Sequence, residues 1–157
     1  MNKGKLPKVL IIGHTRGIGK AIFDYYSKQG YKVKGLSRSN GFNLSDPDVF
    51  YKHIWAYDWI ILNAYYYNSQ LKLLEHIVDN HSHKRKKVVV ITSTSGIDVC
   101  FDKSLNIDSY KEYSKQKKKL IKYIERIQQK IINQPIQIFD VCPDVVDTKM
   151  SKGLWTD

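Results

Sequence analysis

Short apolar runs alternate with segments of helical period along this chain. Strands are predicted over residues 9–12, 31–36, 57–64, 87–92 and 136–142, with a further short strand and turn in the NGFNLSD segment at 40–46. The runs are brief and rich in Val and Ile, as in parallel strands buried on both faces. Helices are predicted over 18–30, 46–57, 68–80 and 108–132. This alternation, with short links, indicates an α/β fold: a doubly wound, mostly parallel sheet of about six strands with helices on both faces.

The helix predicted over 108–132 carries one charge on an otherwise non-ionic stripe. The stripe advances by steps of four and three and should face the sheet; it consists of Tyr113, Lys117, Leu120, Ile124, Ile127 and Ile131. A buried lysine is costly unless a polar group receives it. Tyr113 lies one turn before Lys117 on the same side. Lys117 is therefore either part of a site with Tyr113 or a lysine that extends past the sheet edge to water.

A glycine cluster follows the first predicted strand. Gly13, Gly17 and Gly19 have the spacing GxxxGxG and precede an amphipathic segment in which Ile18, Ile22, Tyr25 and Tyr26 recur at helical spacing. Unpaired amides at a helix start and the helix dipole attract anions, and glycine lets a phosphate approach the backbone. The cluster predicts a nucleotide-binding turn. The alternative is a turn that only packs the helix on the strand.

The second predicted strand ends in Ser37-Arg38-Ser39. In a dinucleotide-binding fold, this position faces the adenosine ribose, where an acid binds a 2′-hydroxyl and an arginine pairs with a 2′-phosphate. Arg38 stands there, and Arg16 lies in the glycine turn. The pair favours NADP, with NAD as a possible cofactor, over the alternative that both arginines are ordinary surface residues.

Composition narrows the remaining classes of protein and the partners to be expected. The chain of 157 residues, with 42% hydrophobic and 26% charged residues, fits a single domain over 1–157. Its two cysteines and the HSHKRKK stretch indicate no disulfide framework and no metal site. Without an apolar span or signal peptide, we expect a cytoplasmic protein with no membrane partner. The net charge of +11 lacks a recognition motif or interleaved aromatic residues, so nucleic acid is an unlikely partner.

Five segments resemble, in order, the motifs of one enzyme family. GHTRGIG resembles the turn TGxxxGIG, LNA at 62–64 resembles NNAG, and ITSTSG at 91–96 resembles the serine strand. YSKQK at 113–117 matches YxxxK, and CPDVVDT at 142–148 resembles the PG segment that leads to a threonine. The chain is thus similar to short-chain dehydrogenases/reductases over nearly its whole length.

This resemblance implies a reaction and a set of residues. Tyr113 would be the proton donor or acceptor, Lys117 its activator and ribose ligand, Ser93 a partner of the substrate oxygen and Asn68 the fourth catalytic residue. The implied function is an NADP(H)-dependent oxidoreductase interconverting a carbonyl and an alcohol. Besides Tyr113 and Lys117, the implied cofactor-binding residues are Gly13, Thr15, Arg16, Gly17, Ile18, Gly19, Ser37, Arg38, Asn63, Ala64, Pro143, Val145 and Thr148.

Departures from the family pattern support an alternative function. Tyr65 and Asp144 replace family glycines. The sequence stops at Asp157, ahead of the family's substrate-covering segment, so we expect the substrate pocket to have little lid of its own. The alternative is a nucleotide-binding or regulatory protein with the same fold and little or no turnover. In either case the family resemblance implies a homo-oligomer, a dimer or tetramer, and the enzyme would take a small carbonyl or alcohol substrate.

Overall fold

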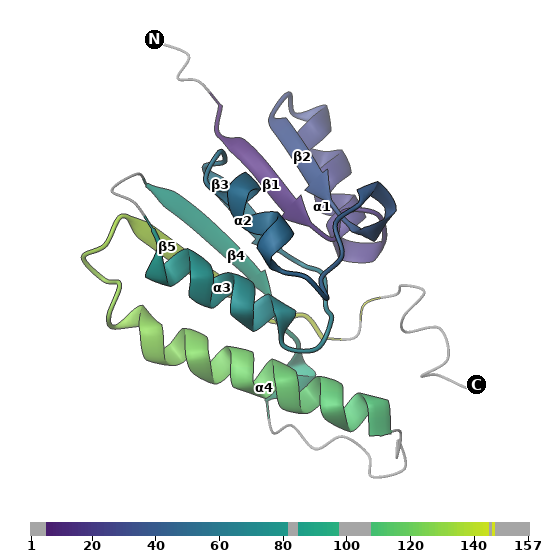
Figure 1. Ribbon diagram of the computed structural model, residues 1–157, viewed down its shortest axis with the longest axis vertical. Coiled ribbons are helices and arrows are strands. Elements are labelled where there is room, and N and C mark those ends of the chain that lie inside the picture. The colour runs from purple at the N-terminus through teal and green to yellow at the C-terminus, as the bar shows by residue number, and fades with distance from the viewer. Residues whose placement is uncertain (1–5, 82–84, 98–107, 145, 147–157) are drawn as a thin grey trace.

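Five parallel strands form the centre of the molecule (Figure 1). The structure is a computed structural model that describes residues 6–81, 85–97, 108–144 and 146. The strands are β1 (Lys8–Ile12), β2 (Lys32–Leu36), β3 (Trp59–Leu62), β4 (Lys86–Ile91) and β5 (Ile136–Val141). The helices are α1 (Gly17–Lys28), α2 (Asp48–Ile54), α3 (Ser69–Asp79) and α4 (Asp108–Gln128), with short 3-10 turns η1 (Arg38–Asn40) and η2 (Thr94–Gly96).

The strand order β2-β1-β3-β4-β5 places the start of the chain in the middle of the sheet. From β1 the chain crosses to β2 on one side and then returns to β3 on the other side. Because all pairs are parallel, the carboxyl ends of the strands meet at one edge. In such sheets ligands bind in the crevice where the winding direction reverses. Here that crevice lies beyond the ends of β1 and β3.

Helices cover both faces of the sheet, as predicted (Figure 1). On one face, α1 packs Ile18, Ile22 and Tyr26 against a cluster that contains Val9 and Ile11 of β1. On the other face, α2, α3 and α4 enclose the larger core, made from the alternate residues of the same strands. The β1 residues from Val9 to Ile12 are at most 1% exposed. The doubly wound α/β fold class is therefore confirmed, although Tyr25 of the α1 pattern is 60% exposed.

The apolar stripe of the long helix faces the core. Lys117 and Leu120 are 3% and 2% exposed, and Ile124, Ile127 and Ile131 are also buried. The helix ends at Gln128, about one turn earlier than predicted. The predicted helix at 46–57 is likewise shorter, because α2 begins at Asp48 with Pro47 as its N-cap instead of its first residue.

The short strand predicted at 40–46 is absent, and the sheet of the described residues has five strands. The Asn40 side chain accepts a hydrogen bond from the Ser37 amide at 2.8 Å and donates one to the Gly35 carbonyl at 2.9 Å. Gly41 then adopts a left-handed φ of 89°. An asparagine that bonds the neighbouring backbone favours a turn over a ladder. The turn predicted for this segment is therefore present, but the strand is not.

Candidate functional site

The glycine turn is locked to the end of β3. A Cβ on Gly19 would collide with the carbonyl oxygen of Gly13, and one on Gly13 would lie 2.6 Å from the Ala64 Cβ. Gly13 also has a φ of +92°, which L side chains rarely adopt. The Asn63 side chain donates to the Gly13 carbonyl at 2.9 Å. The structure thus brings together four predicted cofactor residues, Gly13, Gly19, Asn63 and Ala64, at the crevice.

The start of α1 fits an anionic group. Arg16 is the N-cap in extended conformation, no side chain caps the helix, and its first turn contains no acid. The positive φ of 52° at Gly17 lets the chain enter the helix directly from this turn. Thr15, Arg16 and Gly17 are exposed. Amides without a capping side chain at a dipole's positive end suit a phosphate.

Arg16 and Arg38 follow two neighbouring strands at the carboxyl edge of the sheet. β1 pairs with β2 in register, so the turn that carries Arg16 and the η1 turn that begins at Arg38 both follow the carboxyl ends of adjacent strands. Both side chains are exposed. Ser37 is held by the Asn40 side chain and by a 2.8 Å contact between its hydroxyl and that of Ser39. Arg16 and Arg38 thus both follow the carboxyl ends of adjacent strands.

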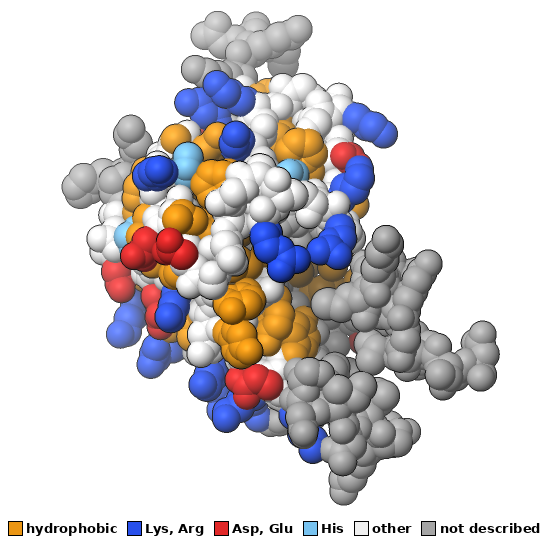
Figure 2. All heavy atoms as spheres, turned by 45° about the vertical axis from the view of Figure 1, so that its right-hand side comes forward, with side chains coloured by type: hydrophobic (Ala, Val, Ile, Leu, Met, Phe, Trp, Pro, Cys, Tyr) orange, Lys and Arg blue, Asp and Glu red, His pale blue; other side chains and the backbone are white. Residues whose placement is uncertain are grey.

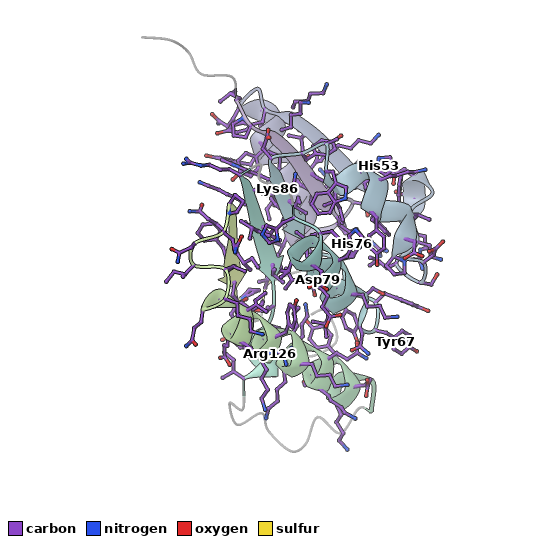
Figure 3. The ribbon with its side chains drawn as sticks, turned by 60° about the vertical axis from the view of Figure 1, so that its left-hand side comes forward. His53, Tyr67, His76, Asp79, Lys86 and Arg126 are labelled. Atoms are coloured by element: carbon purple, nitrogen blue, oxygen red, sulfur yellow. The ribbon has the colours of Figure 1, made fainter. Side chains whose placement is uncertain are left out.

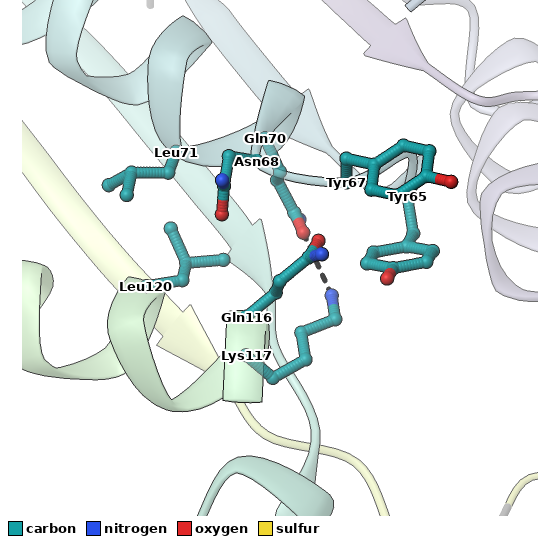
Figure 4. A pocket seen from close by; sticks show the side chains of 8 residues that line it. All are labelled: Tyr65, Tyr67, Asn68, Gln70, Leu71, Gln116, Lys117 and Leu120. Atoms are coloured by element: carbon teal, nitrogen blue, oxygen red, sulfur yellow. Dashed lines mark hydrogen bonds between the residues drawn. The ribbon is translucent and has the colours of Figure 1, made fainter. Parts of the chain in front are cut away.

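Lys117 is buried and held by two acceptors, one of which is the Gln70 side chain drawn in Figure 4. Its Nζ donates to Gln70 Oε1 and to the Ile91 carbonyl, each at 2.8 Å. At 3% exposure the lysine does not reach past the sheet to water. Burial lowers its pKa from 10.5 to about 8, while the nearby Asp140 and Cys142 partly oppose that effect. These two hydrogen bonds thus offset part of the free-energy cost of burying the ammonium group.

Tyr113 lies beside this lysine, together with an unforeseen aromatic neighbour. The Lys117 Nζ is 5.5 Å from the centre of the Tyr113 ring and 5.8 Å from that of Tyr65. The two rings meet edge to face with centroids 4.7 Å apart. Burial raises the pKa of Tyr65, and Glu112 adds to the effect. The residue that replaces the family glycine therefore packs directly on the predicted catalytic pair.

Ser93 reaches the same edge from the end of β4. It is the N-cap of η2, and its hydroxyl accepts hydrogen bonds from the Ser95 amide at 3.3 Å and the Ser95 hydroxyl at 2.9 Å. Behind it, Gly96 packs so tightly on α4 that a Cβ there would lie 2.8 Å from the Lys117 backbone. Only a glycine lets η2 approach α4 this closely. The η2 turn that Ser93 begins is therefore held against α4 at Lys117.

The segment after β5 closes this side of the site. The Thr94 amide donates to the Pro143 carbonyl, and the Thr94 hydroxyl donates to the Asp144 carboxylate, both at 3.1 Å. Asp144 thus points at η2 and has a hydrogen-bond donor there. The predicted cofactor residues Val145 and Thr148 lie outside the described residues.

Asn68 lines a small pocket next to Lys117 but is not its hydrogen-bond partner. The Asn68 Oδ1 and Gln116 Oε1 atoms are buried without a partner among the described residues. The other lining residues are Tyr65, Tyr67, Gln70, Leu71, Lys117 and Leu120 (Figure 4). The side chain that accepts a hydrogen bond from Lys117 is that of Gln70, two positions later. A signal was present, because Gln70 shares a helical face with Leu73, Leu74 and Ile77.

Two other classes of site find no support within the described ranges. No group of three or more His, Cys, Asp or Glu side chains is arranged there to hold a metal ion. None of the helices seen in these ranges combines the length and hydropathy needed to cross a bilayer.

Solved structures similar to this chain include short-chain dehydrogenases and related oxidoreductases. A short-chain dehydrogenase from Burkholderia cenocepacia in complex with NADP matches with a TM-score of 0.75 at 14% identity, over 97% of this chain and 78% of that one. A 3-alpha-hydroxysteroid dehydrogenase from Pseudomonas complexed with NADH matches with 0.71 at 14% identity, over 92% and 75%. A short-chain family oxidoreductase from Burkholderia thailandensis matches with 0.71 at 17% identity, over 94% and 72%.

These matches show the Rossmann-like fold of the short-chain dehydrogenases/reductases, which confirms the predicted resemblance at the level of the fold. No protein-family model and no curated protein sequence matches the chain.

Proposed function

We propose that this protein binds NADP(H) and interconverts a carbonyl compound and an alcohol. The observation that carries the proposal is the convergence at one sheet edge of a closely packed glycine turn, an uncapped helix start and a buried Lys117 beside Tyr113. The similar solved enzymes, two of which are described with NADP or NADH, support it. The proposal includes membership of the short-chain dehydrogenase/reductase family and a cytoplasmic location.

Each residue of the site has a separate task. The cofactor, when bound, would supply or accept the hydride at the substrate carbon. Tyr113 would give its proton to the substrate oxygen in reduction and take it back in oxidation. The Lys117 ammonium beside it favours the phenolate and so eases that transfer. Ser93 would donate a hydrogen bond to the same oxygen, and Asn68 is retained as a candidate fourth residue.

Cofactor preference tests the phosphate-binding half of the site. Arg16 and Arg38 should make NADPH bind more tightly than NADH, because a charge-assisted phosphate contact is worth on the order of 1.5–3 kcal/mol. We expect Arg38→Asp to erase or reverse this preference, measured by titration of nicotinamide fluorescence. Equal affinity of the unmutated protein for the two cofactors would refute the NADP assignment.

The catalytic half is tested by a matched set on α4. Tyr113→Phe keeps the ring that packs on Tyr65 and loses only the hydroxyl, so it should fold and bind NADPH but lose carbonyl reduction. Lys117→Ala should impair both binding and turnover, whereas Lys118→Ala, the next residue on the helix, should impair neither. Activity on a panel of carbonyl substrates and thermal unfolding are measured for all three. Full turnover by Tyr113→Phe contradicts the acid–base role.

Two contacts favour a second candidate, a nucleotide-binding or regulatory protein with little turnover. Tyr65 packs on Tyr113 and lies over Lys117, where a family glycine would leave open space. Asp144 adds a carboxylate next to η2. NADPH binding by the wild type without reduction of any carbonyl compound on the panel favours this candidate. In that case Tyr65→Gly should be tested for recovery of turnover.

We also propose that the protein assembles as a dimer or tetramer. Pairing through α3 and α4 would bring lysines of α4 close across a two-fold axis, unless acids such as Glu112 and Glu125 intervene. Assembly should therefore be weaker at low salt. Analytical ultracentrifugation at high protein concentration and moderate salt checks this, and a purely monomeric protein there would contradict it.

A further inference from the structure

Gln70 is buried at the centre of the site with its whole amide engaged. Its Nε2 donates to the Leu62 carbonyl at 2.6 Å and to the Ile91 carbonyl at 2.9 Å. Its Oε1 accepts the hydrogen bond from Lys117 Nζ at 2.8 Å. The side chain is 3% exposed. One amide thus connects α3 with the last residues of β3 and β4 and with the lysine of α4.

The neighbours allow only one orientation of this amide. A rotation by 180° would place the carbonyl oxygen of Gln70 against the two backbone oxygens of Leu62 and Ile91, and its NH₂ group against the ammonium of Lys117. All three contacts would then be repulsive, because each would pair two donors or two acceptors. Oε1 therefore has to face Lys117.

These contacts fix the orientation of the Lys117 ammonium group. An ammonium carries three hydrogens; one is used by Gln70 and one by the Ile91 carbonyl. The rings of Tyr65 and Tyr113 lie on the same side of this nitrogen, with centroids 5.8 and 5.5 Å from it and 4.7 Å from each other. The third hydrogen is thereby left to the side of the site where Tyr113 lies.

We propose that Gln70 is the positioning residue of this site: its amide ties Lys117 to the ends of β3 and β4 and sets how the ammonium faces Tyr113. The inference rests on the proposed function for its catalytic meaning. It adds Gln70 to the site residues that the sequence predicted.

The alternatives at position 70 show why an amide suits it. Glutamate could pair with Lys117, but its oxygens would oppose the Leu62 and Ile91 carbonyls. Methionine, of similar size, would leave two carbonyls and the ammonium without this partner. The other ionisable groups around the lysine are Tyr113 on its own helix, Tyr65 after β3, and Asp140 and Cys142 in and after β5. A neutral partner in this setting leaves the lysine with its lowered pKa.

The test follows the protonation of Lys117 itself and needs no turnover. The full-length protein is prepared with ¹³C,¹⁵N-lysine, and the Lys117 side-chain signal is identified by its loss in Lys117→Met and titrated with pH. Gln70→Glu should move its midpoint up by at least about one pH unit, because a carboxylate favours the ammonium. Gln70→Met should move it down, because the acceptor is lost. Gln137→Glu is the control: it adds the same charge on β5, at a position that alternates with the core-facing Ile136 and Ile138.

The outcomes separate the two proposals. Opposite shifts in Gln70→Glu and Gln70→Met, with the control unchanged, support the positioning role even if no carbonyl compound is reduced. Such shifts without any carbonyl reduction would overturn the proposed reaction but not the positioning role of Gln70. A Lys117 midpoint that is unmoved in folded Gln70→Met overturns the inference, whatever the enzyme does. If Gln70→Glu fails to fold, Gln70→Met decides on its own, since it adds no charge.

Discussion

Replacing Lys117 by methionine should change how the stability of the protein depends on pH. Methionine has a similar length and no charge, so the variant loses the titration of the buried ammonium. Burial lowers the pKa of this group from 10.5 to about 8 in the folded protein. The folded state therefore releases the proton at lower pH than the unfolded chain does. Between these two values the unfolded state binds more protons, and the stability of the wild type rises with pH.

The size of the effect follows from that difference in pKa. Each pKa unit corresponds to about 1.4 kcal/mol, so the charged lysine costs about 3 kcal/mol at neutral pH before its hydrogen bonds are counted. The free energy of unfolding of the wild type, minus that of Lys117→Met, should rise by about 2.5 kcal/mol between about pH 7 and about pH 10. Titrating groups that do not interact with Lys117 contribute equally to both proteins and cancel in the difference.

Urea unfolding followed by circular dichroism at a series of pH values measures this difference. Lys115→Met removes an exposed ammonium from the same helix and should leave the pH slope of stability as it is. The absolute stability of Lys117→Met is not diagnostic, because the acceptors on Gln70 and Ile91 lose their donor. If the difference between wild type and Lys117→Met is flat with pH, the lysine is hydrated in solution and its assignment to a buried site is wrong.

Two further substitutions, each with a control, test buried contacts elsewhere in the fold. Gly19→Ala should lower the free energy of unfolding by about 3 kcal/mol or more and abolish NADPH binding, because its methyl group would collide with the Gly13 carbonyl. Gly30→Ala meets no atom within 4 Å and should cost only about 1 kcal/mol for its left-handed backbone; equal losses in thermal unfolding would contradict the crowding argument. Lys86→Met should cost about 2–3 kcal/mol, because the buried Lys86 Nζ donates to the Tyr57 carbonyl at 2.6 Å (Figure 3). Lys87→Met, an exposed neighbour, should cost less than about 1 kcal/mol, and a similar loss in both variants by chemical denaturation would refute the role of the buried contact.

The fold could be predicted because the signals were local and repeated. Residues 9–12 are all apolar and residues 88–92 are all β-branched, which suits strands buried on both faces. Lys117 could be singled out because a charge on an apolar stripe is conspicuous when helical spacing is followed. The same rule applied to α3 would have found Gln70, but an uncharged glutamine is common enough on helix surfaces that it attracted no attention.

The orientation of side chains in the loop after β3 could not be predicted from the sequence. Tyr65 was recognised as a replacement for a glycine, yet its contact with Tyr113 depends on how the chain turns after β3. The next two tyrosines complete an exposed run, with Tyr66 42% and Tyr67 61% exposed. Tyr67 also has a positive φ of 42°, rare for a side chain of this size. Figure 2 shows hydrophobic side chains gathered on one face and bordered by Lys and Arg. No periodic pattern predicts such a loop.

The position of β5 at the end of the sheet has a consequence for the order in which the site is assembled. β1, β2 and β3 supply the glycine turn and its contact with Asn63, and all three are complete within the first half of the chain. The η2 segment with Ser93 takes its partners from β5 and the residues after it. During synthesis, the nucleotide-binding half can therefore form before the half that carries Ser93 and Lys117. In the mature protein, local opening of this edge strand would release the second half while the first stays folded, so amide hydrogen exchange should be faster in β5 than in β1.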